Sequence, residues 1–249
     1  MTTRWKLRIE YDGSGFCGWQ RQADAPSVQQ AIEEAIFKFS GESPTLHAAG
    51  RTDTGVHARA QTAHFDLEKD TTPDTVRDAI NFHVRPNKAV ILDAEIAHKD
   101  FHARFDAIKR SYRYFIINRR APLAIKDNYS WHVARPLDID AMQKAADLLI
   151  GKHDFSTFRA RDCQSNSPIK TLDLLKITQK DEAIVIETEA RSFLYHQVRN
   201  MVGSLSLVGN GNWSIDDFQT ALKACDRTKG GPTAPAHGLF FWEVTYPQK

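Results

Sequence analysis

The sequence has few of the patterns that mark membrane, disulfide-rich or metal proteins. Its three cysteines, Cys17, Cys163 and Cys225, are scattered and lack CxxC spacing, which argues against a disulfide framework and a structural zinc site. The ten histidines include no HExxH pair, so we expect no metal. No apolar run is long enough to cross a bilayer, and residues 1–6 lack the apolar core of a signal peptide. We therefore expect no membrane association and a cytoplasmic location.

Cofactor motifs and a strong charge bias are also missing. The chain has no P-loop and no dinucleotide fingerprint, so we expect no cofactor. Its net charge is only +2. Basic residues nevertheless cluster between residues 104 and 120, against the single acid Asp106: Arg104, Lys109, Arg110, Arg113, Arg119 and Arg120. Such a cluster indicates either a footprint for phosphates or a solvated basic strand and loop.

Hydrophobic periodicity predicts a βαββαβ order in the first part of the chain. Residues 5–11 alternate apolar and polar strictly, as a strand with one buried face does. Ser27 and Gln30 fit a capping box that opens a helix. The further predicted elements are strands over 45–49, 59–67 and 90–96 and helices over 28–39 and 74–82.

The second part repeats this pattern without repeating the residues. Predicted strands cover 109–118, 174–179, 183–190 and 240–246, and predicted helices cover 138–150, 195–208 and 214–224. Asp138 is the expected cap of the first of these helices, and Gly151 the glycine that ends it. The sequence therefore predicts an α+β protein of two ferredoxin-like halves, residues 1–107 and 108–249. We expect their strands to form a mostly antiparallel sheet with a central cleft.

One glycine-bracketed loop stands out between two predicted strands: Gly50-Arg51-Thr52-Asp53-Thr54-Gly55-Val56-His57. Glycine permits backbone angles that other residues avoid, so this loop can be tight. Beside Arg51, Asp53 would remain ionised and could act as a nucleophile or a base. Taken alone, the alternative is a turn aspartate that hydrogen-bonds its own backbone.

This loop resembles the hallmark motif of the TruA family of tRNA pseudouridine synthases, except that alanine is commoner at the position of Thr54. The resemblance extends along nearly the whole chain. Similar segments are Tyr11-Asp12-Gly13, Gly18-Trp19-Gln20-Arg21-Gln22, Phe101-His102-Ala103-Arg104-Phe105, Asp154-Phe155-Ser156-Thr157-Phe158-Arg159, Val198-Arg199-Asn200-Met201-Val202-Gly203-Ser204-Leu205 and Thr233-Ala234-Pro235-Ala236-His237-Gly238-Leu239.

The resemblance implies the pseudouridine synthase fold and an isomerase that converts uridine to pseudouridine at positions 38–40 of the tRNA anticodon stem-loop. Asp53 matches the essential aspartate, and its first step stays open between attack on C1′, addition to C6 and removal of a ribose proton. Tyr112 matches a tyrosine that packs on the target base, and Arg199 an arginine that pairs with the aspartate. Arg51 is a candidate to fill the gap left by a flipped base or to bind phosphate. The family also implies a homodimer with tRNA as partner.

Two other functions compete with this prediction. A non-catalytic RNA-binding protein could share the fold, but it would not need the combination of Asp53, Tyr112 and Arg199. A base-excising glycosylase could also place an aspartate near C1′, and it would release free uracil. Arg104, Arg110, Arg159 and Arg161 are further candidates for phosphate contacts.

Overall fold

The computed structural model describes residues 2–247. The chain forms two compact units: unit 1 contains the residues up to 108 together with those from 240 on, and unit 2 contains Lys109–Leu239. Both combine helices with mostly antiparallel strands, so the predicted α+β class is confirmed. Within the described range, the helices are all too short or too polar to span a membrane.

Unit 1 is built on the predicted βαββαβ order. Its elements are β1 (Thr3–Tyr11), α1 (Val28–Ser40), β2 (His47–Ala48), β3 (His57–Leu67), α2 (Pro73–His83), β4 (Ala89–Ile96) and, from unit 2 into unit 1, β10 (Leu239–Thr245). The antiparallel core runs β4-β1-β3, with β2 antiparallel to β3. This order is that of a ferredoxin-like sheet. The start of β3 also pairs with β10, in parallel.

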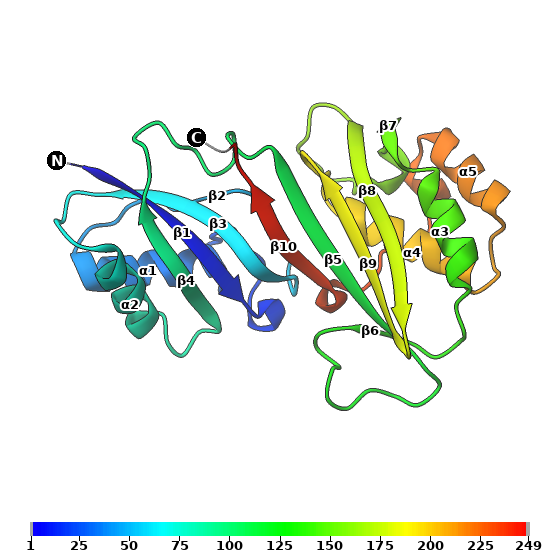
Figure 1. Ribbon diagram of the computed structural model, residues 1–249, viewed down its shortest axis with the longest axis horizontal. Coiled ribbons are helices and arrows are strands. Elements are labelled where there is room, and N and C mark those ends of the chain that lie inside the picture. The colour runs from blue at the N-terminus through cyan, green and yellow to red at the C-terminus, as the bar shows by residue number, and fades with distance from the viewer. Residues whose placement is uncertain (1, 248–249) are drawn as a thin grey trace. The chain divides into compact units, whose positions relative to one another are not determined.

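Helix α1 covers this sheet because one of its faces is apolar. Val28, Ile32 and Ile36 are fully buried and face the sheet that carries Leu7 and Ile9. Figure 1 shows α1 and α2 together behind the strands of unit 1. The result is a sheet with helices on one face, which leaves the other face for polar side chains.

The start of α1 differs in part from the prediction. Ser27 caps the helix as expected, accepting a hydrogen bond from the Gln30 backbone at 3.3 Å. The Gln30 side chain donates to Glu34 instead of turning back to Ser27. The reciprocal half of the predicted capping box is therefore wrong, because an i,i+4 partner competes for the amide.

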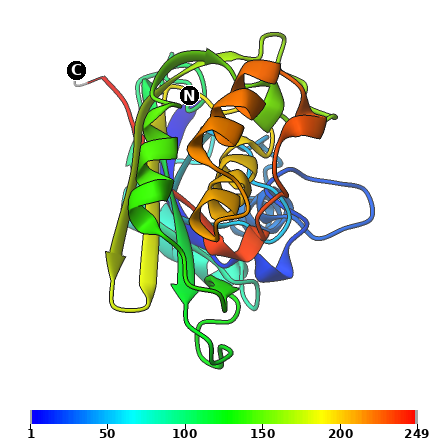
Figure 2. The same cartoon turned by 90° about the vertical axis from the view of Figure 1, so that its right-hand side faces the viewer.

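Unit 2 has a second antiparallel sheet with helices packed on it. Its elements are β5 (Lys109–Asn118), β6 (Trp131–Val133), α3 (Ile139–Asp147), β7 (Gly151–Asp154), β8 (Ile169–Lys180), β9 (Ala183–Ala190), α4 (Gln197–Gly209) and α5 (Ile215–Ala224). The strand order is β5-β9-β8-β7, and β6 pairs in parallel with β5. Figure 2 shows these helices gathered beside the strands.

Several boundaries in unit 2 differ from the predicted ones; β8, for example, begins at Ile169 rather than near residue 174. Asp138 caps α3 as expected, but the helix ends at Asp147 rather than near residue 150. Gly151 adopts a φ of 97° and opens β7, a strand that periodicity did not predict. The short β6 was not predicted either. The closing strand, which we expected within 108–249, pairs with β3 from Phe240 on. A boundary between independent domains near residue 107 stays a prediction.

Half of the basic cluster lies on β5, beside β9 with its glutamates. Lys109 contacts Glu189 at 2.7 Å, and Arg113 pairs with Glu187. Beyond the strand end, Arg119 contacts Glu182 at 2.9 Å. Cross-strand pairs of opposite charge stabilise a sheet. Ion pairs within unit 2 therefore balance three of the six basic residues of this segment.

Candidate active site

The loop that carries Asp53 lies in unit 1 between β2 and β3. The Val56 backbone N–H donates to the Asp53 carbonyl at 3.1 Å, which closes a tight turn. Gly55 within that turn has a φ of 78°, an angle that favours glycine. At the other end of the loop, the Gln61 side chain donates to the Gly50 carbonyl at 2.7 Å. Hydrogen bonds thus hold the backbone on both sides of a half-buried Asp53.

Tyr11, at the end of β1, anchors the residue before Asp53. Its hydroxyl and the Thr52 hydroxyl are 2.7 Å apart in a buried hydrogen bond. Burial raises the pKa of Tyr11 far above its ordinary value, and the nearby Asp53 carboxylate adds to the rise. Tyr11 is therefore a neutral, fixed hydrogen-bonding group beneath the loop.

Two glycines allow neighbouring segments to approach the loop closely. A Cβ on Gly13 would overlap the Val56 carbonyl, and a Cβ on Gly18 would lie 2.6 Å from the Thr52 carbonyl oxygen. Gly18 also has a φ of 87°. Its neighbour Trp19 donates its backbone N–H to the same Thr52 carbonyl at 3.0 Å. The segments Tyr11-Asp12-Gly13 and Gly18-Trp19 therefore pack closely against the Asp53 loop and fix its backbone conformation.

His57 fixes the point where the loop enters β3. It is buried, and its Nδ1 accepts the Gly13 backbone N–H at 3.0 Å. Its ring stacks on Phe240 with centroids 4.6 Å apart. Asp12 lies 3.2 Å from the same nitrogen and also binds Lys88 at 2.8 Å. These contacts make His57 a support of the loop.

In unit 2, Tyr112 and Tyr114 lie on β5 in different surroundings. Tyr112 is half-buried and packs edge-on against Phe193, with centroids 5.0 Å apart. Tyr114 is fully buried, and its hydroxyl donates to the Pro235 carbonyl at 2.7 Å. Burial raises the pKa of Tyr114 far above its ordinary value. Tyr114 is thus a packing residue.

Arg199 lies on the first turn of α4 and is held by the segment that also binds Tyr114. Its Nε donates to the Ala234 carbonyl at 2.8 Å, and the Ala234 N–H donates back to the Arg199 carbonyl at 3.1 Å. A Cβ on Gly238 would lie 2.6 Å from the Tyr114 ring. Residues 234–238 therefore contact both β5, through Tyr114, and α4, through Arg199. Sequence reasoning missed this role, although the segment was one of the family-like motifs.

The predicted site residues are distributed over both units. Asp53 and an exposed Arg51 belong to unit 1, whereas Tyr112 and Arg199 belong to unit 2. Within unit 1 the structure brings Asp53 together with Tyr11, which periodicity alone assigned only to a strand. The pairing of Arg199 with Asp53 joins two units and stays a prediction.

The other arginine candidates have varied surroundings. Arg110 is buried and donates to the Arg191 carbonyl at 2.6 Å. Arg159 donates to the carbonyls of Cys163 and Ser165, both at 2.7 Å, and so shapes its own loop. Arg104 and Arg161 are exposed. Within residues 2–247, His, Cys, Asp and Glu form no group of three or more that could hold a metal ion.

Comparison with known proteins agrees with this architecture. A family model described as tRNA pseudouridine synthase matches residues 8–106 and 145–247. A protein named tRNA pseudouridine synthase A from Paramagnetospirillum magneticum is 56% identical over 243 residues, which is 98% of this chain and 95% of that protein. The proteins of the same name from Rhodospirillum centenum and Methylobacterium radiotolerans are 54% and 55% identical, and each match covers 98% of this chain and at least 98% of theirs. The chain belongs to the tRNA pseudouridine synthase family, whose members are isomerases.

A solved chain from a structure titled "Crystal Structure of a Cbf5-Nop10-Gar1 Complex" is also similar. The match covers 82% of this chain and 54% of that chain, at 8% identity and a TM-score of 0.32. A likeness of this size supports no conclusion about the site.

Proposed function

We propose that this enzyme converts uridine to pseudouridine in tRNA, at positions 38–40 of the anticodon stem-loop. The observation that carries the proposal is the Asp53 loop, whose backbone is held by contacts from the segments Tyr11-Asp12-Gly13 and Gly18-Trp19. The chain that contains this loop matches the family over nearly its full length. The reaction breaks the bond from uracil N1 to ribose C1′, turns the base and joins C5 to C1′. C5 then loses a proton and N1 gains one, so nothing is oxidised and no cofactor is required.

Asp53 is the proposed catalytic residue. Its backbone is fixed from two sides, through the Thr52 contacts to Tyr11 and Trp19 and through the turn to Val56. A carboxylate held this way loses little freedom when substrate binds, which favours catalysis by positioning. Three first steps are compatible with it: attack on C1′, addition to uracil C6 and removal of a ribose proton.

The remaining site residues have proposed roles in binding. In this proposal Tyr112 stacks on the flipped uracil. Stacking of one base on one aromatic ring contributes about 1–3 kcal/mol to binding. Arg199, whose guanidinium is oriented by its hydrogen bond to the Ala234 carbonyl, forms an ion pair with Asp53 in this proposal. Arg51 fills the space left by the flipped base, and its contacts there offset part of the free energy spent on unstacking that base. We also propose a cytoplasmic homodimer in which one tRNA contacts both subunits; light scattering of the purified protein tests the dimer.

The decisive experiment is incubation with an unmodified tRNA transcript, followed by mapping of pseudouridine at each position. Modification confined to positions 38–40 supports the proposal, and modification elsewhere refutes the site range. Release of free uracil would indicate a glycosylase. Binding without any product would indicate a non-catalytic RNA-binding protein.

Asp53→Asn tests the catalytic residue in the same assay. We expect it to abolish turnover and to leave tRNA binding near the wild-type level, because the amide keeps the shape of the side chain and loses its charge. Thr54→Ala is the matched control: it alters the exposed neighbour of Asp53 to the residue that is commoner in the family, and turnover should persist. Isomerisation by Asp53→Asn would exclude Asp53 as the catalytic group.

A further inference from the structure

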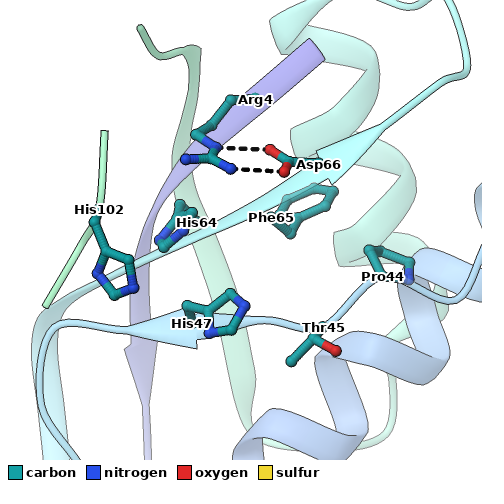
Figure 3. Close-up of a pocket in the computed structure, with 8 residues that line it drawn as sticks. All are labelled: Arg4, Pro44, Thr45, His47, His64, Phe65, Asp66 and His102. Carbon is teal, nitrogen blue, oxygen red and sulfur yellow. Dashed lines mark hydrogen bonds and ion pairs between the residues drawn. The ribbon is translucent and has the colours of Figure 1, made fainter. Parts of the chain in front are cut away.

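Three histidines gather in unit 1 around a cavity of about 330 Å³ (Figure 3). His47 comes from β2, His64 from β3 and His102 from the segment after β4. The His47 and His64 rings stack with centroids 5.1 Å apart, and the His102 ring meets His64 edge-on at 4.7 Å. The proposed reaction assigns no role to this cluster.

Backbone hydrogen bonds fix the protons of two of these rings. His64 Nδ1 accepts the Ala103 N–H at 3.1 Å, and His102 Nδ1 accepts the Arg104 N–H at 3.1 Å. A ring nitrogen that accepts carries no proton, so each neutral ring carries its proton on Nε2. Burial, with the neighbouring His102 and Arg4, lowers the pKa of His64 to about 4, and burial likewise lowers the pKa of His102. At neutral pH both rings are therefore uncharged Nε2–H donors.

This arrangement selects a ligand that accepts hydrogen bonds. A metal ion binds the lone pair of a ring nitrogen, and in this tautomer the Nε2 lone pairs are not available. Arg4 does not supply the binding charge, because its guanidinium is bound to Asp66 by two hydrogen bonds of 2.7 Å and to the Phe101 carbonyl at 2.9 Å. The Nε2–H groups of the imidazoles are therefore suited to donate hydrogen bonds to an oxygen atom of a ligand.

The surroundings of the cavity fit a nucleotide. Phe105 is 69% exposed, and its ring centroid is 4.3 Å from that of His102. The exposed Arg104 guanidinium lies 5.8 Å from the Phe105 ring. An exposed aromatic ring next to hydrogen-bond donors is the combination that stacks a base and holds the adjacent phosphate.

We propose that His47 and His102, packed on the buried His64, bind a backbone phosphate of the RNA substrate, with Phe105 stacking the neighbouring base. The site lies outside the proposed catalytic residues and rests on the proposed action on tRNA. Its contribution is to affinity, because none of these side chains belongs to the Asp53 loop. RNA recognition by phosphate and stacking contacts of this kind is independent of sequence.

The test is the dissociation constant for a tRNA transcript, with kcat measured in parallel. In the double variant His47→Ala and His102→Ala we expect binding to weaken about tenfold, as for two lost hydrogen bonds, and kcat at saturation to stay unchanged. His64 is left in place because it is only 2% exposed. His98→Ala is the matched control: His98 Nδ1 also accepts a backbone N–H two residues on, from Asp100 at 3.3 Å, and should not affect binding.

A second pair of variants tests the donor itself. His47→Gln and His102→Gln together keep an N–H donor at similar reach and should recover part of the lost affinity. A double alanine variant that binds tRNA as the wild type does would overturn the proposal, and so would an equal loss in His98→Ala. Failure of glutamine to recover any affinity would overturn the hydrogen-bonding role.

Inorganic phosphate distinguishes the source of the ligand. We expect millimolar phosphate to move the imidazole NMR signals of the cluster less than tRNA does. Phosphate that moves them fully, with unchanged tRNA affinity in the double variant, would make this a free-anion site and overturn the RNA assignment. Wild-type protein that binds tRNA without isomerising it refutes only the proposed function, whereas protein that does not bind tRNA refutes both proposals.

Discussion

Gly18→Ala should separate the positioning of Asp53 from the general stability of unit 1. The φ of 87° at this glycine costs an alanine about 1–2 kcal/mol. The new Cβ would also lie 2.6 Å from the Thr52 carbonyl oxygen. Relieving that overlap adds about 1–3 kcal/mol, as overpacking does, and moves the backbone next to Asp53 by a substantial part of an ångström. A displacement of about 1 Å at a reacting group reduces the rate about 100-fold.

Gly41→Ala is the control for this experiment. Gly41 has a φ of 78°, but a Cβ there has no neighbour within 4 Å. It should lose the same 1–2 kcal/mol of backbone strain and keep its kcat. Urea denaturation measures the free energy of unfolding, and single-turnover kinetics on tRNA measures the rate. Equal single-turnover rates in Gly18→Ala and Gly41→Ala would refute the idea that Gly18 shapes the Asp53 loop.

Three further changes test contacts in both units. Tyr11→Phe leaves the buried Thr52 hydroxyl without its partner and should lower the free energy of unfolding by about 1–2 kcal/mol in urea denaturation. Gly203→Ala places a methyl group on the Pro232 carbonyl and should cost about 3 kcal/mol or more, with a lower melting temperature; an unchanged one would contradict the packing. Because the pKa of His64 falls from 6.5 to about 4 on folding, the unfolded state binds more protons between these values. Stability should therefore fall as pH drops from about 6.5 to about 4, by no more than about 3 kcal/mol, and a His64→Gln variant should show a weaker dependence.

Much of the fold could be predicted from periodicity. The boundaries of β5 and β9 agree with the predicted 109–118 and 183–190. In β9, buried and half-buried residues alternate strictly, as expected of a strand with one covered face. The short strands β6 and β7 were missed, since three or four residues carry too little alternation to be recognised. Gly151 indicated a helix end, and its positive φ instead serves the entry into β7.

The site depended on a different kind of information. Asp53 in isolation resembled an ordinary turn residue, and only the family-like motifs singled it out. The roles of Gly13 and Gly18 arise from contacts with residues far along the chain, which no local pattern encodes. The hydrogen bonds from Tyr114 and Arg199 to residues 234–238 are long-range in the same way. The sequence thus pointed to a candidate reacting group, Asp53, but not to the residues that support its loop.

The parallel pairing of β10 with the start of β3 has a consequence for biosynthesis. Phe240 stacks on His57, yet it leaves the ribosome long after the loop it supports. Chains emerge at about 5–20 residues per second and tend to fold from the N-terminal side. Unit 1 can therefore assemble β1, β3 and β4 early, while the entry to the Asp53 loop waits until residue 240 has been made. A nascent chain lacks this support until the whole of unit 2 has been made.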